Sequence, residues 1–372
     1  MSRAHRVTIL VFALVAGLVP VAALAGSTPS TVPGKWHVLA RQPVALPYGA
    51  SVWTGGRLIV FGRRPLTKTT YEPSVNAAVS FDPARNVWRT LSPPARAGLG
   101  LGCCTAAVWT GTRALVFGEN VAYRPSTDEW RPIHAVIPEG IVAWTGGEAI
   151  GWGGGCCGDA RSDGAAYNPA TDTTRKLPRS PLAPSQDPIG AWDGHELLIF
   201  VSGYGPEVQR YPARFARGAA YDPATNSWRR LAPLPVHGTR FASSAAWTGT
   251  ELIVVGAGPT FRATFAFDPH ANRWTRLASS PTSRTGAAAI WTGDRLVAWG
   301  GTGRAGFVYD PATNRWSVLA QPPFRDPAGM SAVWTGRSLL AFGGVIGSSA
   351  ATHNQQVWPR DVAAFTPAAR RS

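Results

Sequence analysis

A short motif, Trp-Thr-Gly, recurs along this 372-residue chain and once takes the form Trp-Asp-Gly. The seven copies begin at Trp53, Trp109, Trp144, Trp192, Trp247, Trp291 and Trp334. Successive copies are 56, 35, 48, 55, 44 and 43 residues apart. Repeats of about this length that each contain several short strands are typical of β-propeller blades, because one small sheet cannot bury both of its faces without neighbours.

The segment from residue 289 to residue 319 shows what one repeat contains. Four short apolar runs are separated by three turn signals, which is the pattern of four antiparallel strands. The first turn is Thr292-Gly293-Asp294, where glycine can adopt the positive φ of a tight hairpin. The last turn, residues 310–314, reads Asp-Pro-Ala-Thr-Asn and combines a hydrogen-bond acceptor, a fixed φ and a residue that tolerates the left-handed conformation. Each repeat therefore predicts a four-stranded antiparallel sheet.

Two further aromatic positions keep the same register through the repeats. The third run carries an aromatic residue, with proline two positions later, at Phe81, Tyr123, Tyr167, Tyr221, Phe267, Tyr309 and Phe365. The fourth run carries tryptophan at Trp88, Trp130, Trp228, Trp274 and Trp316, and the third repeat has Thr174 there instead. These positions predict the buried face of the two outer strands.

At these residues the chain resembles the kelch-repeat family, and in particular the central domain of galactose oxidase. The resemblance rests on the glycine pair after the second run, the Tyr-Asp-Pro-x-Thr-Asn-x-Trp run and the following Leu-x-x-x-Pro. It departs from the family where single glycines replace the pair in repeats one, two and five, and where Arg124 replaces aspartate. It implies an all-β, seven-bladed propeller over residues 35–372. Because kelch folds include oxidases, epimerases and binding modules, the resemblance leaves the function open.

The two ends of the chain predict how the ring closes. The seventh repeat ends at residues 366–370 without a fourth run, whereas the N-terminal region carries Trp36 with Leu39 three residues later. We therefore expect the N-terminal strand to complete the last blade, which removes an exposed sheet edge.

The first 25 residues have the features of a secretory signal peptide. Arg3 and Arg6 precede an apolar run, and Ala23-Leu24-Ala25 fits a cleavage site. An uncleaved membrane anchor is the alternative, but the apolar run is short and Pro20 interrupts it. We expect a secreted protein of the bacterial type without a stable membrane anchor, in which residues 26–34 form a linker.

The formal net charge of +15 is compatible with an anionic partner. Part of the excess has a structural explanation, because many arginines occupy expected outer strands, where charge discourages edge-to-edge pairing. No basic helix or basic–aromatic groove motif is present, so a nucleic-acid partner is not expected.

Strand order predicts two different faces. The short Thr-Gly and Asp-Pro turns share one face, whereas the blade-to-blade loops and the insertions after the second strands share the other, where function is expected. The candidate ligand residues on that second face are Arg63, Arg96, Arg161, Arg179, Arg214, Arg240, Arg284 and Arg325. Either these arginines converge on a carboxylate, sulfate or phosphate, or each one only bonds the carbonyls of a neighbouring blade.

Four cysteines occur as two adjacent pairs, Cys103-Cys104 and Cys156-Cys157, both on the same face. In an exported protein disulfides are expected. Two bridges between the loops are favoured over bonds within each pair, because neighbouring Cα atoms lie closer than disulfide geometry prefers. A four-thiolate metal site is a further alternative, although its ligands are normally separated by two or more residues.

Candidate catalytic residues are few. The resemblance to galactose oxidase would imply copper held by two tyrosines and two histidines, but the tyrosines of the repeat occupy the structural third-run position. The histidines are spread around the ring: His37, His134, His195, His237, His270 and His353. We expect no metal, no cofactor and no catalytic residue, and a binding module for a glycan, cell-wall polymer or protein, with acidic ligands included. The alternative is an extracellular sugar enzyme that resembles galactose oxidase or a sialate epimerase.

Overall fold

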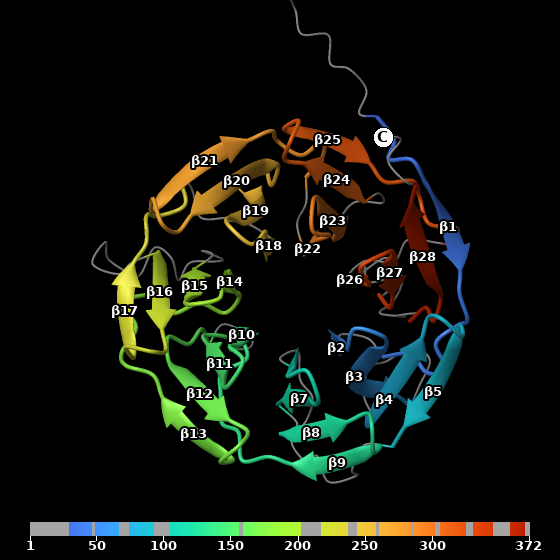
Figure 1. Cartoon of the computed structure of the whole chain (residues 1–372), viewed down its shortest axis with the longest axis horizontal. Coiled ribbons are helices and arrows are strands. Elements are labelled where there is room, and N and C mark those ends of the chain that lie inside the picture. The colour runs from blue at the N-terminus through green and yellow to red at the C-terminus, as the bar shows by residue number, and fades with distance from the viewer. Residues whose placement is uncertain are drawn as a thin grey trace, which may run out of the picture.

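The protein is a ring of seven four-stranded antiparallel sheets, which confirms the seven-bladed propeller predicted from the repeat (Figure 1). The computed structural model describes residues 30–46, 49–66, 74–92, 105–118, 120–155, 159–201, 217–236, 244–257, 260–283, 286–301, 306–324, 330–344 and 358–368. Within these ranges all regular structure is β-strand, and no helix that could cross a membrane occurs.

Each blade contributes one strand to each of four concentric positions. The inner strands are β2 (Ala50–Trp53), β6 (Ala106–Trp109), β10 (Ile141–Trp144), β14 (Ile189–Trp192), β18 (Ser244–Trp247), β22 (Ala287–Trp291) and β26 (Ser331–Trp334). The second strands are β3 (Leu58–Pro65), β7 (Ala114–Phe117), β11 (Ala149–Trp152), β15 (Leu197–Phe200), β19 (Leu252–Ala257), β23 (Leu296–Gly300) and β27 (Leu339–Phe342). The third strands are β4 (Ser74–Asp82), β8 (Val121–Arg124), β12 (Gly164–Asn168), β16 (Gly218–Asp222), β20 (Ala263–Asp268), β24 (Phe307–Asp310) and β28 (Val362–Pro367). The outer strands are β5 (Val87–Leu91), β9 (Glu129–Pro132), β13 (Thr173–Lys176), β17 (Ser227–Arg230), β21 (Arg273–Leu277), β25 (Arg315–Val318) and β1 (Gly34–Val38).

The hydrophobic core lies between the blades. Seven clusters of buried residues each combine side chains of two neighbouring blades. Six of the seven second strands are apolar throughout, as in Leu197–Phe200, because both faces of such a strand are covered by other blades, and β3 is apolar up to Gly62. The third-run aromatics are at most 2% exposed at all seven positions.

The Thr-Gly motif closes the hairpin between the inner and second strands. In the first blade the hydroxyl of Thr54 accepts a hydrogen bond from the Arg57 amide at 3.0 Å, and Gly55 has a φ of 91°. In the fourth blade the carboxylate of Asp193 accepts the amide of Glu196 at 2.7 Å. Threonine and aspartate are interchangeable here because both place an oxygen where the turn needs an acceptor.

The turn between the third and outer strands holds each blade against the preceding one. Asn314, at a φ of 49°, accepts hydrogen bonds from the Tyr309 hydroxyl and from the amide of Ala278 in the preceding blade, both at 2.8 Å. The indole of Trp316 donates to the carbonyl of Ala278 at 2.7 Å. One residue of the preceding blade, Ala278, is therefore held at both its amide and its carbonyl.

The same arrangement explains the threonine at the tryptophan position of the third blade. The hydroxyl of Thr174 donates to the carbonyl of His134 at 3.2 Å and accepts the amide of Val136 at 3.2 Å. Asp172 accepts the amide of His134 at 2.9 Å. Threonine thus replaces the hydrogen bond of the indole, although it does not replace its packing.

The N-terminal strand closes the ring, as the chain ends predict. Strand β1 pairs antiparallel with β28, and Trp36 lies opposite Phe365. The Trp36 indole donates to the carbonyl of Ala320 at 2.7 Å, as the indoles of Trp88, Trp228, Trp274 and Trp316 donate to a carbonyl of their preceding blade. The closing strand is therefore equivalent to the fourth strand of an ordinary blade.

A second contact reinforces this closure. The amide of Val32 donates to the Val318 carbonyl, and the amide of Val318 donates to the Ser30 carbonyl, both at 2.8 Å. Residues 30–32 fall in the segment expected to be a linker, and in the structure they pair with outer strand β25 of the sixth blade.

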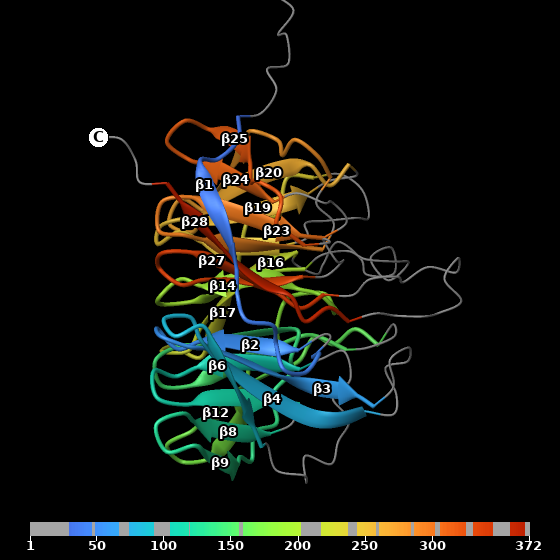
Figure 2. The same cartoon turned by 90° about the vertical axis from the view of Figure 1, so that its right-hand side faces the viewer.

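The two faces of the ring differ (Figure 2). We call the face with the inner-to-second and third-to-outer turns the turn face, and the opposite face the loop face. Strands β3 and β4 are eight and nine residues long and form an arm that projects on the loop face, whereas most strands of the other blades have four to six residues.

Candidate functional site

The loop face was the expected ligand face, and three of its eight candidate arginines lie in described ranges: Arg63, Arg161 and Arg179. The other five, Arg96, Arg214, Arg240, Arg284 and Arg325, lie outside the described residues, as do all four cysteines. The pairing of the cysteines therefore remains an expectation.

Arg63 lies on the projecting arm of the first blade. It faces Asn76 across the β3–β4 pair, and the neighbouring Arg64 faces Val75 and is exposed. Apart from Asp82 at the opposite end of β4, the described part of the arm has no acidic residue. The arm thus brings positive charge to the loop face.

Arg161 belongs to a compact, hydrogen-bonded loop region between the third and fourth blades. Gly153, Gly154 and Gly155 all have positive φ values, between 69° and 120°, which side chains disfavour. The amide of Gly154 donates to the Ser185 carbonyl at 2.8 Å. The amide of Arg161 donates to the Gly154 carbonyl, and the amide of Ser185 donates to the Arg161 carbonyl, both at 2.9 Å. These bonds join the insertion of the third blade to the loop that leads into the fourth.

The charges of this loop region are largely balanced by one another. The Arg161 guanidinium donates to both oxygens of Asp163, at 3.0 and 2.7 Å, and this bonding lowers the pKa of Asp163 and raises that of Arg161. Burial raises the pKa of the nearby Glu139. Arg161 therefore contributes less net positive charge to the face than its sequence suggests.

Arg179 lies close to the outer rim of the ring. It follows Pro178, whose carbonyl accepts the Trp228 indole at 3.0 Å, and it stands three residues beyond the end of strand β13. Its side chain is exposed. The structure thus places Arg63, Arg161 and Arg179 in separate positions: on the arm of the first blade, in the loop region after β11 and at the rim.

The residues expected for a copper site do not come together in the described part of the chain. The hydroxyls of Tyr123, Tyr167, Tyr221 and Tyr309 each donate to an aspartate or asparagine of their own third-to-outer turn. His37 lies on outer strand β1, and His134, His195 and His270 lie at the rim or in turns. Among all the residues that the structure describes, no group of three His, Cys, Asp or Glu side chains that could hold a metal ion occurs.

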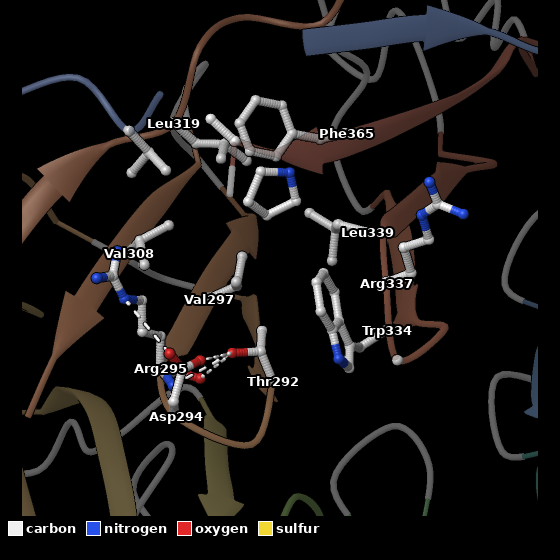
Figure 3. A pocket seen from close by; sticks show the side chains of 14 residues that line it. Thr292, Asp294, Arg295, Val297, Val308, Leu319, Trp334, Arg337, Leu339 and Phe365 are labelled. Atoms are coloured by element: carbon white, nitrogen blue, oxygen red, sulfur yellow. Dashed lines mark hydrogen bonds and ion pairs between the residues drawn. The ribbon is translucent and has the colours of Figure 1, made fainter. Parts of the chain in front are cut away.

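A pocket of about 340 Å³ lies on the turn face, between the sixth and seventh blades (Figure 3). Its walls are mostly apolar: Val32, Val297, Val308, Leu319, Trp334, Leu339, Phe365, Pro367 and Ala368. Thr292, Asp294, Arg295, Gly336 and Arg337 form its polar part. Reasoning from sequence missed this site, because it treated the turn face as purely structural.

The polar residues of the pocket come from two Thr-Gly turns. Asp294 accepts a hydrogen bond from Thr292 at 3.0 Å. The Arg295 guanidinium lies 3.2 Å from Asp310 of its own blade and 3.9 Å from Asp294, so its charge is compensated. Arg337 is exposed on the turn of the seventh blade, and among the described residues no carboxylate lies within ion-pair distance of it. Arg337 thus places positive charge at the rim of the pocket, without a carboxylate partner among the described residues.

No protein-family model matches the chain, and no curated protein matches it. Among solved structures, a fungal alcohol oxidase described as catalytically diverse within the AA5 family, and determined in complex with copper, is similar with a TM-score of 0.65. The two chains are 14% identical, and the match covers 90% of this chain and 76% of the oxidase. Identity this low shows a common fold and does not transfer chemistry. The similarity therefore supports the propeller fold of this chain.

Proposed function

We propose that this propeller is a secreted, non-catalytic binding module that holds an anionic polymer, in the first place an acidic glycan, on its loop face. The observation that carries the proposal is the arm formed by β3 and β4, which projects from the ring and bears Arg63 and Arg64. A rigid scaffold with projecting, variable segments is a common arrangement for binding sites.

The repeat residues support this reading because most of them are engaged in holding the blades together. The third-run tyrosines, the turn asparagines and the outer tryptophans bond one another or the preceding blade. Arg175 and Arg229 on the outer strands bond Glu148 and Glu196 of their own blades. Recognition is then assigned to segments outside the repeat, where arginine can bind carboxylates or sulfates in bidentate fashion.

The test compares two pairs of arginines that change the net charge equally. The variant Arg63→Ala with Arg64→Ala should weaken binding to immobilised polygalacturonate at least tenfold, and binding should fall with added salt because screening acts over about 8–10 Å at moderate ionic strength. The matched variant, Arg273→Ala with Arg276→Ala on exposed positions of β21, should bind like the parent. Equal loss in both variants, or equal binding to neutral dextran, would reject the arm as the site. Binding to an acidic peptide but to no polysaccharide would identify a protein ligand instead.

An extracellular sugar enzyme is the second candidate, favoured only by the fold shared with the copper-containing oxidase. The described tyrosines and histidines do not fit a copper site, as shown above, so no catalytic step is assigned. Metal analysis of the purified protein after copper loading, together with hydrogen peroxide release from galactose and primary alcohols, would decide. Stoichiometric copper with peroxide release would replace the binding-module proposal.

A further inference from the structure

The pocket between the sixth and seventh blades lies at the seam where the following blade is completed by the N-terminal strand. The first six blades enter their outer strands through a turn that ends in asparagine or aspartate, whereas the seventh blade takes its outer strand from the other end of the chain. The seventh blade therefore has no asparagine to place at its seam. The seam between the third and fourth blades shows which side chains occupy the equivalent place in an ordinary pair of blades.

At that seam, three side chains fill the turn-face side. The guanidinium of Arg175 reaches the Tyr221 hydroxyl at 2.8 Å and the Asn226 side chain at 3.1 Å, and it also bonds Glu148. The tyrosine hydroxyl and Asn226 bond each other at 2.7 Å. Side chains of two blades thus bond one another across this seam.

The strand register identifies the equivalent residues at the seam between the sixth and seventh blades. Ser317 follows Trp316 as Arg175 follows Thr174, and Phe365 takes the place of Tyr221. Gly34 lies two residues before Trp36, as Asn226 lies two residues before Trp228. An arginine, a hydroxyl and an asparagine are thus replaced by a serine, a hydrogen and a glycine. Phe365 lines the pocket, whereas Ser317 and Gly34 are not among its lining residues, so no side chain enters it from the places of Arg175 and Asn226.

We propose that this pocket binds a small aromatic carboxylate. The walls are apolar, and the Trp334 side chain lies along one of them and is partly exposed, so a planar ring can pack there (Figure 3). The charge of Arg337 at the rim, which has no carboxylate partner among the described residues, favours an anionic group on the ligand. A volume of about 340 Å³ with a few polar groups is typical of a small-molecule site. This site lies on the face opposite to the arm and does not depend on the function proposed above.

The first experiment uses 2-naphthoate as the probe and isothermal titration with the full chain. We expect one site per chain. Ala368→Trp places a large side chain over the pocket from an exposed position and should weaken binding at least tenfold. Ala224→Trp is the matched control, because Ala224 is exposed at the corresponding place in the fourth blade, three residues after Tyr221 as Ala368 is after Phe365. It should leave the affinity unchanged.

The second experiment tests the charge. Arg337→Met keeps the length of the side chain and removes its charge, so it should weaken 2-naphthoate at least fivefold and leave the neutral 2-naphthalenemethanol unaffected. Thermal unfolding of each variant confirms that the fold is retained, since all three positions are exposed. No binding of 2-naphthoate at millimolar concentration, undiminished binding to Ala368→Trp, or equal losses in both tryptophan variants would overturn the site. Equal binding of acid and alcohol by the parent would overturn the preference for a carboxylate.

Discussion

Two seams of the same ring show how one repeat position can serve either stability or binding. The seam between the third and fourth blades is closed by Arg175, Tyr221 and Asn226, which bond one another and the neighbouring blade. The seam between the sixth and seventh blades has Ser317, Phe365 and Gly34 at these places and contains a pocket. The difference follows from the way the chain ends meet, because a blade completed by the opposite terminus has no turn between its last two strands.

The closing seam obtains its stability in another way. Trp36 packs against Phe365 and Trp299, with ring centroids 5.4 and 5.3 Å apart. Residues 30–32 add backbone bonds to β25 of the sixth blade. The seam between the third and fourth blades needs no such segment, because its turn supplies the contacts locally.

The largest effect is expected from removing the closing strand. Deletion through Val38 should cost more than the 3–5 kcal/mol that is typical, roughly, of truncating a single buried tryptophan to alanine, because it also exposes the edge of β28. A chain that begins at Ser30 is the control and should keep the parental stability. Thermal and urea unfolding measure both. If the chain lacking β1 unfolds at the parental temperature, the ring is not closed by this strand.

A smaller loss is expected from Asn226→Ala at the filled seam. The change removes the acceptor of the Tyr221 hydroxyl and of Arg175, and it places alanine at a φ of 52°. The loss should be about 2–3 kcal/mol, from unsatisfied polar groups and left-handed strain together. Urea unfolding would measure it, and Asn226→Asp, which keeps an acceptor, should lose less. Equal stability of the alanine variant and the parent would show that the asparagine does not hold the seam.

The two seams can also be compared at a single repeat position. Arg175→Ala should cost about 1–2 kcal/mol, discounted for its partial exposure, because Glu148 and the tyrosine hydroxyl lose their partner. Ser317→Ala at the sixth seam should change stability by less than about 0.5 kcal/mol, since only the exposed bond to Ser30 is lost. Equal losses at both positions would remove the distinction between a filled and an open seam.

The smallest effect is expected at the rim between the second and third blades. Hydrogen bonds from the His134 amide and ring, and then from Tyr167, lower the pKa of Asp172 to about 2. Since this lies below the value of an exposed aspartate, about 4, the contribution of Asp172 is complete above pH 4 and is lost as the pH falls towards 2. The free energy of unfolding, measured with urea at pH 5, 4 and 3, should fall less steeply for Asp172→Asn than for the parent. Parallel pH profiles would contradict the assignment.

The architecture could be predicted from sequence because its determinants are local and repeated. Trp53 and its six counterparts mark the inner strands, and Trp36 identified the closing strand although it lies more than 300 residues from its partner Phe365. The threonine at position 174 also fits the repeat, since its hydroxyl bonds the same carbonyl that an indole would reach. Periodicity was sufficient because each blade repeats the same hydrophobic and turn pattern.

The candidate sites could be predicted less well, because they depend on what differs between the repeats. Arg161 looked like a free cation in sequence, but it is bonded to Asp163 two residues away. The pocket beside Trp334 arises from an absent turn, and its walls come from residue 32 and from residues 292–368, which only the closed ring brings together. The sequence does contain one signal that was not used: the last position of this turn is asparagine or aspartate in the first six repeats and Arg370 in the seventh.

Closure of the ring by the N-terminal strand is the claim on which the seam comparison depends, and hydrogen exchange of residues 34–38 tests it most directly. We predict that the hydrogen-bonded amides of β1 exchange as slowly as those of outer strand β17, residues 227–230, because both strands pair with a buried third strand. Exchange of residues 34–38 at the rate of an unstructured peptide, while residues 227–230 remain protected, would contradict closure by this strand and with it the origin of the pocket.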